Sequence, residues 1–185
     1  MKGLWMAGAA ALALGGCAGT SDEAAAPSAM ASGVPAAATA AAAPVRAADY
    51  VTQAALSDMY EIQSSQLALT RGSSAVKGFA QQMITDHTAT TNALTATLTS
   101  ANMPASPPAT LDPRRQAMIA ALNGASGPAF DQLYLHQQLM AHQEALALHS
   151  GYAQAGDAPP LKAFAGQVAG RVQMHLDMLR TLGAT

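Results

Sequence analysis

The sequence predicts an all-α fold, a four-helix bundle, on three observations. Four long segments carry apolar residues at the three-and-four spacing of a helix. No segment alternates apolar and polar residues as a half-buried strand does. Glycine and proline lie between the segments, where helices end and begin. With 185 residues, of which 50% are hydrophobic, the chain can bury one core of ordinary size.

The first residues predict an export signal. Lys2 precedes an apolar run from about Leu4 to Leu14, which is too short to span a bilayer. The run ends in LGGC, which resembles the bacterial lipobox. The resemblance implies a signal peptide over residues 1–16 and a diacylglycerol group on Cys17 that anchors the protein to a membrane. A plain signal peptide with an incidental cysteine is the alternative.

The residues after the cysteine predict a tether and a location. Ala18 stands where an aspartate would imply retention in the inner membrane, so the lipobox resemblance implies the periplasmic face of the outer membrane. Residues 17–47 are rich in Ala, Pro, Ser and Thr and lack large apolar side chains, which predicts a disordered tether after the lipidated cysteine. The folded domain is therefore expected over residues 48–183.

Charge and cysteine content exclude several classes of function. The formal net charge is −2 and aromatic residues make up 4% of the chain, so neither a phosphate-tracking groove nor a base-stacking platform can form. We expect no nucleic-acid partner. The single cysteine, Cys17, excludes an internal disulfide, a zinc site built on several thiolates and haem attached through paired cysteines.

The first two helices are predicted from their boundary residues. The first covers about residues 49–71 and ends at Gly72, the residue best able to take a left-handed closing conformation. Ser73 or Ser74 can cap the second, which extends to about residue 101. The short turn between them makes an antiparallel hairpin.

The remaining helices follow a long connection over residues 102–127. Asp112 and Pro113 predict a short helix within this connection. Two further long helices, from about 128 to 155 and from about 159 to 182, form a second antiparallel hairpin. Two hairpins joined by one long crossover are typical of a ferritin-like four-helix bundle. An up-down-up-down bundle is the competing topology.

Three of the long helices each carry a histidine on the inward face. His87, His142 and His175 all lie near the middle of the bundle, so they share one layer whichever way the crossover runs. Glu61 is the acid of the first helix nearest this layer. The four residues predict a nitrogen-rich metal site with one carboxylate, which suits zinc, copper or iron.

Two further acids and two sulfur atoms lie near these histidines in the sequence. Asp86 or Glu144 could orient a neighbouring imidazole. Met83 and Met178 are each one turn from a histidine, and thioethers beside imidazole favour copper(I), although methionine more often fills a core. The alternative for the histidines themselves is a purely structural role in the core.

No catalytic residue is predicted. The chain contains no Gly-x-Ser-x-Gly, no glycine-rich phosphate loop and no His-Glu-x-x-His. It also lacks the Glu-x-x-His pairs of carboxylate-bridged di-iron sites. An enzyme is therefore the least favoured class, and redox or peroxide chemistry at the histidine layer is the one form that it could take.

Three segments resemble the successive signatures of a bacterial exported family catalogued as domain of unknown function 4142, often labelled a predicted outer-membrane protein. They are VKGFAQQMITDHTATTNAL, FDQLYLHQQLMAHQEALALH and LKAFAGQVAGRVQMHLDML. The most specific piece is the Met-x-x-Asp-His of Met83, Asp86 and His87, whereas Ala141 stands where the family usually has an aspartate before His142. The resemblance implies a ferritin-like bundle in the periplasm, without an agreed activity.

Two functions of different classes follow as expectations. In the first, an envelope lipoprotein binds a transition-metal ion through the mid-bundle histidines. In the second, it is a non-catalytic interaction or stress-response lipoprotein whose histidines are structural and set helix register, and whose partner is another envelope protein.

Overall fold

The computed structural model describes residues 45–104 and 106–184. The predicted signal peptide, the lipidated Cys17 and nearly all of the tether lie outside the described residues. The helices are α1 Ala47–Arg71, α2 Ser74–Ser100, α3 Pro113–Gly124, α4 Gly127–Ala155 and α5 Pro159–Thr181. Apart from an isolated bridge between Val45 and Gly156, the regular structure of this part is helical, so the all-α prediction is confirmed.

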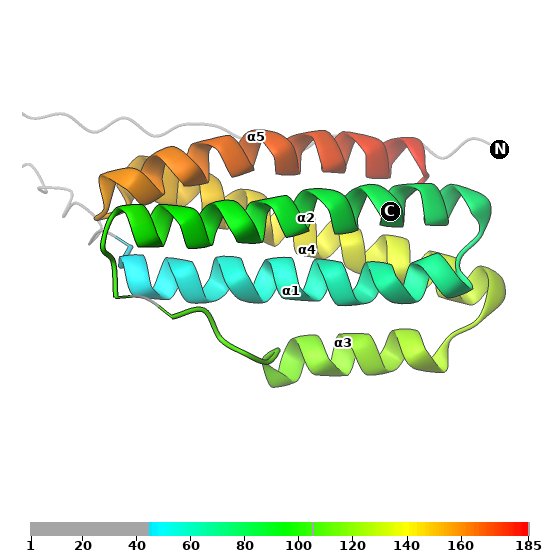
Figure 1. Ribbon diagram of the computed structural model, residues 1–185. Helices are drawn as coiled ribbons and strands as arrows, with labels where there is room; N and C mark the ends of the chain where they lie inside the picture. The colour runs from blue at the N-terminus through cyan, green and yellow to red at the C-terminus, as the bar shows by residue number, and fades with distance from the viewer. Residues whose placement is uncertain (1–44, 105, 185) are drawn as a thin grey trace, which may run out of the picture. The chain divides into compact units, whose positions relative to one another are not determined.

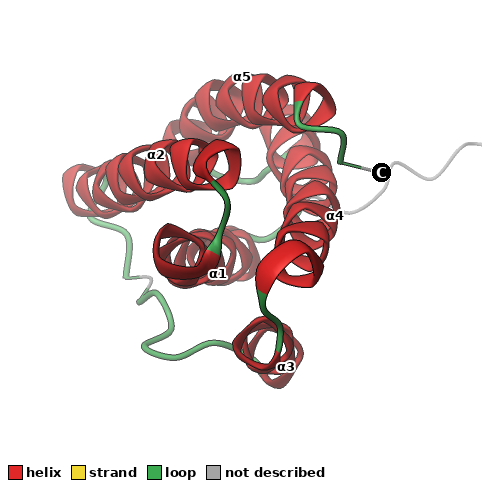
Figure 2. Ribbon diagram, turned by 90° about the vertical axis from the view of Figure 1, so that its right-hand side faces the viewer, coloured by secondary structure: helices red, strands yellow, loops and turns green. Residues whose placement is uncertain are grey.

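The four long helices pack side by side, and α3 lies outside them against α1 and α4 (Figures 1 and 2). Contacts between α1 and α4 show that these two helices are antiparallel. Tyr50, near the start of α1, bonds to His149 near the end of α4, whereas Ser65 bonds to Tyr134 near the start of α4.

The connection from α2 to α4 returns along the length of the molecule. Figure 1 shows α3 running back beside α1, so that α2 and α4 point in the same direction. The chain therefore forms two antiparallel hairpins, α1–α2 and α4–α5, and not an up-down-up-down order. The start of α3 is as predicted, because Asp112 accepts a hydrogen bond of 3.0 Å from the backbone N–H of Arg115 and Pro113 opens the helix.

The turn of the first hairpin differs from the prediction. Gly72 is extended, with φ −74° and ψ 161°, and does not take a left-handed conformation. A Cβ at this position would lie 2.6 Å from Val76 Cγ1 and 2.8 Å from the carbonyl oxygen of Ala68. Ser73 precedes α2 without a side-chain cap, and its own N–H donates to the Asp131 carboxylate at 3.1 Å. The glycine is thus required by close packing and not by its φ angle.

The core is mostly apolar, but the inner faces of α1 and α4 also bury hydroxyl, amide and imidazole groups. All the tyrosines are buried, and each phenol has a hydrogen-bond partner, as buried phenols generally require. The pairs are Tyr50 with His149, Tyr60 with Gln137, Tyr134 with Ser65, and Tyr152 with Asp157. The first three of these bonds join α1 to α4 and fix the register of the two helices.

Among the described helices, none combines the length and the apolar character that crossing a membrane requires.

The second hairpin turn yields a stability prediction. Gly156 is also extended, and a Cβ there would lie 2.5 to 2.7 Å from the ring of Tyr152. That ring cannot yield easily because it is buried and stacked on Tyr50 with centroids 3.9 Å apart. We expect Gly156→Ala to lower the free energy of unfolding by about 1–3 kcal/mol in chemical denaturation.

The matched control is Gly151→Ala. Gly151 is exposed and lies within α4, and an added Cβ there meets nothing within 4 Å. This change should raise the free energy of unfolding by about 0.5–1 kcal/mol. Equal effects of the two substitutions would contradict the packing role of Gly156.

Candidate metal centre

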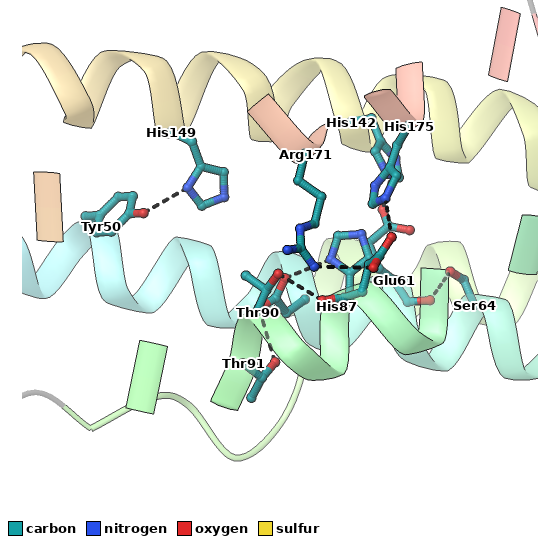
Figure 3. A network of polar contacts seen from close by, with 12 residues as sticks. Tyr50, Glu61, Ser64, His87, Thr90, Thr91, His142, His149, Arg171 and His175 are labelled. Atoms are coloured by element: carbon teal, nitrogen blue, oxygen red, sulfur yellow. Dashed lines mark hydrogen bonds and ion pairs between the residues drawn. The ribbon is translucent and has the colours of Figure 1, made fainter. Parts of the chain in front are cut away.

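Three histidines from three helices converge in the middle of the molecule. His87 comes from α2, His142 from α4 and His175 from α5, and one ring nitrogen of each lies within 4.8 Å of the others. The rings are 4%, 1% and 1% exposed, respectively, and their centroids are 5.2 to 5.6 Å apart. Figure 3 shows the three rings facing one another between the helices. The mid-height layer predicted from the helix lengths therefore brings these residues together.

Each ring uses one nitrogen to donate a hydrogen bond to an acceptor outside the cluster. His87 Nδ1–H donates to Asp58 Oδ1 at 2.8 Å. His142 Nδ1–H donates to the carbonyl oxygen of Gln138 at 2.8 Å, and His175 Nε2–H donates to Asp86 Oδ2 at 2.9 Å. Because carbonyl and ionised carboxylate oxygens only accept, the proton of each neutral ring lies on this outer nitrogen.

The inner nitrogens of neutral rings therefore carry lone pairs. His142 Nε2 and His175 Nδ1 are 3.2 Å apart, and neither has a proton to donate to the other. His87 Nε2 is buried without a hydrogen-bond partner. Such a contact between buried lone pairs is unfavourable unless a cation, either a proton or a metal ion, lies between them.

Burial keeps two of the rings neutral. It lowers the pKa of His142 to about 3, and the nearby His87 and His175 rings lower it further. Burial also lowers the pKa of His175, although its bond to Asp86 opposes the effect. Burial acts in the same direction on His87, but the hydrogen bond and charge of Asp58 outweigh it and raise the pKa.

Asp58 belongs to the candidate site but was not predicted from the sequence. Its Oδ1 holds His87, and its Oδ2 accepts a hydrogen bond of 3.1 Å from the Thr91 hydroxyl. Burial raises the pKa of Asp58, against the effect of the bond from His87. A signal was available, since Asp58 lies fourteen residues before Gly72 and His87 fourteen residues after Ser73, so the hairpin brings them to one height.

Asp86 orients a histidine, as the sequence suggested for it, but the partner is on another helix. Its Oδ2 accepts from His175 and, at 2.7 Å, from the Gln82 amide, while its Oδ1 pairs with Arg171 at 3.3 Å. Although partial burial opposes them, these hydrogen bonds and charges hold the pKa of Asp86 below its usual range. The carboxylate therefore stays ionised beside His175.

Glu61 is buried beside the cluster but is not one of the converging groups. Its side chain is 1% exposed, and its Oε1 lies 3.7 Å from His142 Nδ1, on the outer side of that ring. Neither carboxylate oxygen has a hydrogen-bond partner within normal geometry. Burial raises the pKa of Glu61 to about 7, against the opposing effects of His87 and the Gln138 amide.

The structure does not bring Glu144 to the histidines. Its carboxylate forms a two-pronged ion pair with Arg114 at the surface, with distances of 3.0 and 2.5 Å. The methionines that could have added sulfur ligands differ in burial, since Met83 belongs to the apolar core and Met178 is 36% exposed. His149, two turns along α4, bonds to Tyr50 Oη at 2.8 Å and stands apart from the converging nitrogens.

The buried carboxyl of Glu61 predicts a pH dependence of stability. The pKa of Glu61 is about 7 in the folded state against an ordinary value of 4.5, so the folded state binds more protons between these pH values. The free energy of unfolding should therefore fall as pH rises from about 5 to 8, by about 3 kcal/mol from this group. Glu61→Gln removes this contribution, and so denaturant titrations should find the variant stabilised relative to wild type much more at pH 8 than at pH 5.

The exposed Glu144→Gln serves as the control and should leave the pH dependence unchanged. If the difference in free energy of unfolding between the wild type and Glu61→Gln is the same at both pH values, burial does not shift the pKa of Glu61.

Comparison with known proteins adds a family and nothing closer. No curated protein and no solved structure matches the chain significantly. The family model described as Domain of unknown function (DUF4142) matches residues 32–182, and the chain therefore belongs to that family, as the resemblance of its three histidine-bearing segments indicated.

Proposed function

We propose that this protein is an envelope lipoprotein whose domain, a ferritin-like four-helix bundle, binds a transition-metal ion through His87, His142 and His175. The observation that carries the proposal is the pair of facing lone pairs on His142 Nε2 and His175 Nδ1, 3.2 Å apart, with the unpartnered Nε2 of His87 nearby. Three rings that turn one nitrogen inward, while a fixed acceptor holds the outer nitrogen of each, are the arrangement that metal-binding histidines adopt.

The spacing supports an ion of the size of zinc. A bond of about 2.0–2.1 Å from zinc to each imidazole nitrogen places tetrahedral ligand atoms about 3.3–3.4 Å apart. The 3.2 Å between His142 and His175 is close to this value, and the ligand atom of His87 lies within 4.8 Å of those of the other two rings. Zinc, copper and iron all accept imidazole nitrogen, and each is a candidate.

Deep burial favours binding over catalysis. The three rings are at most 4% exposed, and they are held from three separate helices. A site of this kind suits sequestration, buffering or structural use of the ion, whereas catalytic metal sites keep a position open to substrate. As part of the proposal, this activity belongs to the periplasmic face of the outer membrane, and the lipobox resemblance at Cys17 supports that location.

One observation favours the second candidate, a non-catalytic interaction or stress-response lipoprotein with structural histidines. The bond from His142 Nδ1–H to a carbonyl one turn earlier on its own helix is the bond that a core histidine makes without any metal. In that case a proton shared between His142 and His175 takes the place of the ion. Metal titration separates the two candidates.

A matched pair of substitutions on α4 tests the metal site. The purified full chain is stripped with chelator and titrated with Zn²⁺, Cu²⁺ and Fe²⁺ by calorimetry. We expect binding at micromolar or tighter dissociation constants, lost in His142→Leu and retained in His149→Leu, since both rings are buried but only His142 belongs to the cluster.

Thermal unfolding provides an independent measurement. An ion at 100 times its dissociation constant should raise the free energy of unfolding by about 2.7 kcal/mol in the wild type and the His149→Leu variant. If no ion produces heat or a shift in melting temperature with the wild-type chain, the histidines are structural and the proposal is wrong.

The outer acceptors should also affect affinity. Asp58 touches the proposed ligand His87 and not the ion position, so Asp58→Asn weakens the orientation of the ring without removing a ligand. We expect an affinity for Zn²⁺ lower by roughly 10–100-fold, the usual effect of losing such a partner. Asp177→Asn, an exposed acid of α5, is the control and should bind as the wild type does.

A further inference from the structure

We infer that Glu61 is the fourth ligand of the proposed metal site and makes the site selective for divalent transition-metal ions over Cu⁺. This inference rests on the proposed function, because Glu61 adds one ligand to the three imidazole ligands. The feature that sets Glu61 apart is a buried carboxylate without hydrogen bonds beside the cluster.

Three acids approach the histidine rings, and Glu61 differs from the other two. The closest oxygen to nitrogen distances are 2.8 Å for Asp58, 2.9 Å for Asp86 and 3.7 Å for Glu61. Asp58 and Asp86 each accept hydrogen bonds from a histidine and from a further side chain, so their oxygens are engaged. Both oxygens of Glu61 remain available.

The position of Glu61 supplies what the three rings lack. It lies on α1, the one long helix that contributes no histidine to the cluster. Its side chain reaches the His142 ring, in the region where Figure 3 shows the histidines together. The proposal requires a change of the Glu61 rotamer that carries an oxygen from the outer edge of His142 toward the inner nitrogens, and all four long helices would then hold one ion.

The chemistry of the completed set gives the selectivity. Neutral imidazoles bring no charge, so an anion in contact with a divalent ion in this buried layer would stabilise it. Three nitrogens and one carboxylate oxygen form a closed tetrahedral set that suits Zn²⁺ and Co²⁺. Cu⁺ prefers soft sulfur donors and gains little from a carboxylate. Glu61 therefore raises affinity for the divalent ions selectively.

The test compares ions in the wild-type full chain and in Glu61→Gln. Zn²⁺ and Co²⁺ are titrated under the same conditions, and Cu⁺ is titrated anaerobically against a competing chelator. We expect Glu61→Gln to weaken Zn²⁺ and Co²⁺ binding by roughly 100-fold, about one ligand's share of the affinity of a four-ligand zinc site. The affinity for Cu⁺ should stay as in the wild type.

The visible spectrum of bound Co²⁺ gives a second readout. The wild-type complex should show the intense bands of four-coordinate cobalt, and these bands should change in both Glu61→Gln and Glu61→Met. Two variants are compared so that a folding defect in one of them cannot by itself explain the change. Glu144→Gln, which removes a surface acid of α4, should change neither affinity nor spectrum.

The outcomes distinguish the two proposals. The role of Glu61 is wrong, while the three-histidine site stands, in either of two cases. In the first, Glu61→Gln binds Zn²⁺ as tightly as the wild type and leaves the cobalt spectrum unchanged. In the second, Glu61→Gln weakens the binding of Cu⁺ as much as that of Zn²⁺. If the wild-type chain binds none of the three ions, both proposals are wrong.

Discussion

The protein depends on how a buried layer in its middle satisfies imidazole lone pairs. A buried nitrogen that is removed from bulk solvent needs a hydrogen-bond partner or a bound cation. The outer nitrogens of His87, His142 and His175 have fixed acceptors, and the inner ones face each other. A shared cation resolves this conflict, and the metal site that we propose is one form of it.

The surrounding fold holds this layer in place. Phenol and amide hydrogen bonds between α1 and α4 fix the register of these two helices on either side of it. The two hairpin turns set the heights of α2 and α5. Each turn contains an extended glycine in close contact with the adjoining helices, Gly72 with Ala68 and Val76, and Gly156 with Tyr152. The histidines can therefore converge although they are far apart in the sequence.

The acids around the cluster divide into two kinds. Asp58 and Asp86 are engaged in hydrogen bonds, and each orients one ring. Glu61 is fully buried without such bonds, which is an unfavourable state for a carboxyl group and one that raises its pKa. A protein that retains an unfavourable buried acid beside three lone pairs has an arrangement suited to receiving positive charge.

The sequence by itself determined the helices and the height of the site. Periodicity, proline and glycine gave the helices to within about two residues, because helix boundaries depend on local chemistry. Counting from the turns placed the three histidines in one layer, since the rise per residue of a helix is constant. The sequence could not decide which carboxylate bonds to which histidine ring. Asp58 at His87, Asp86 at His175, and Glu144 away from all three depend on the rotation of each helix against its neighbours, which only the packing of the whole core sets.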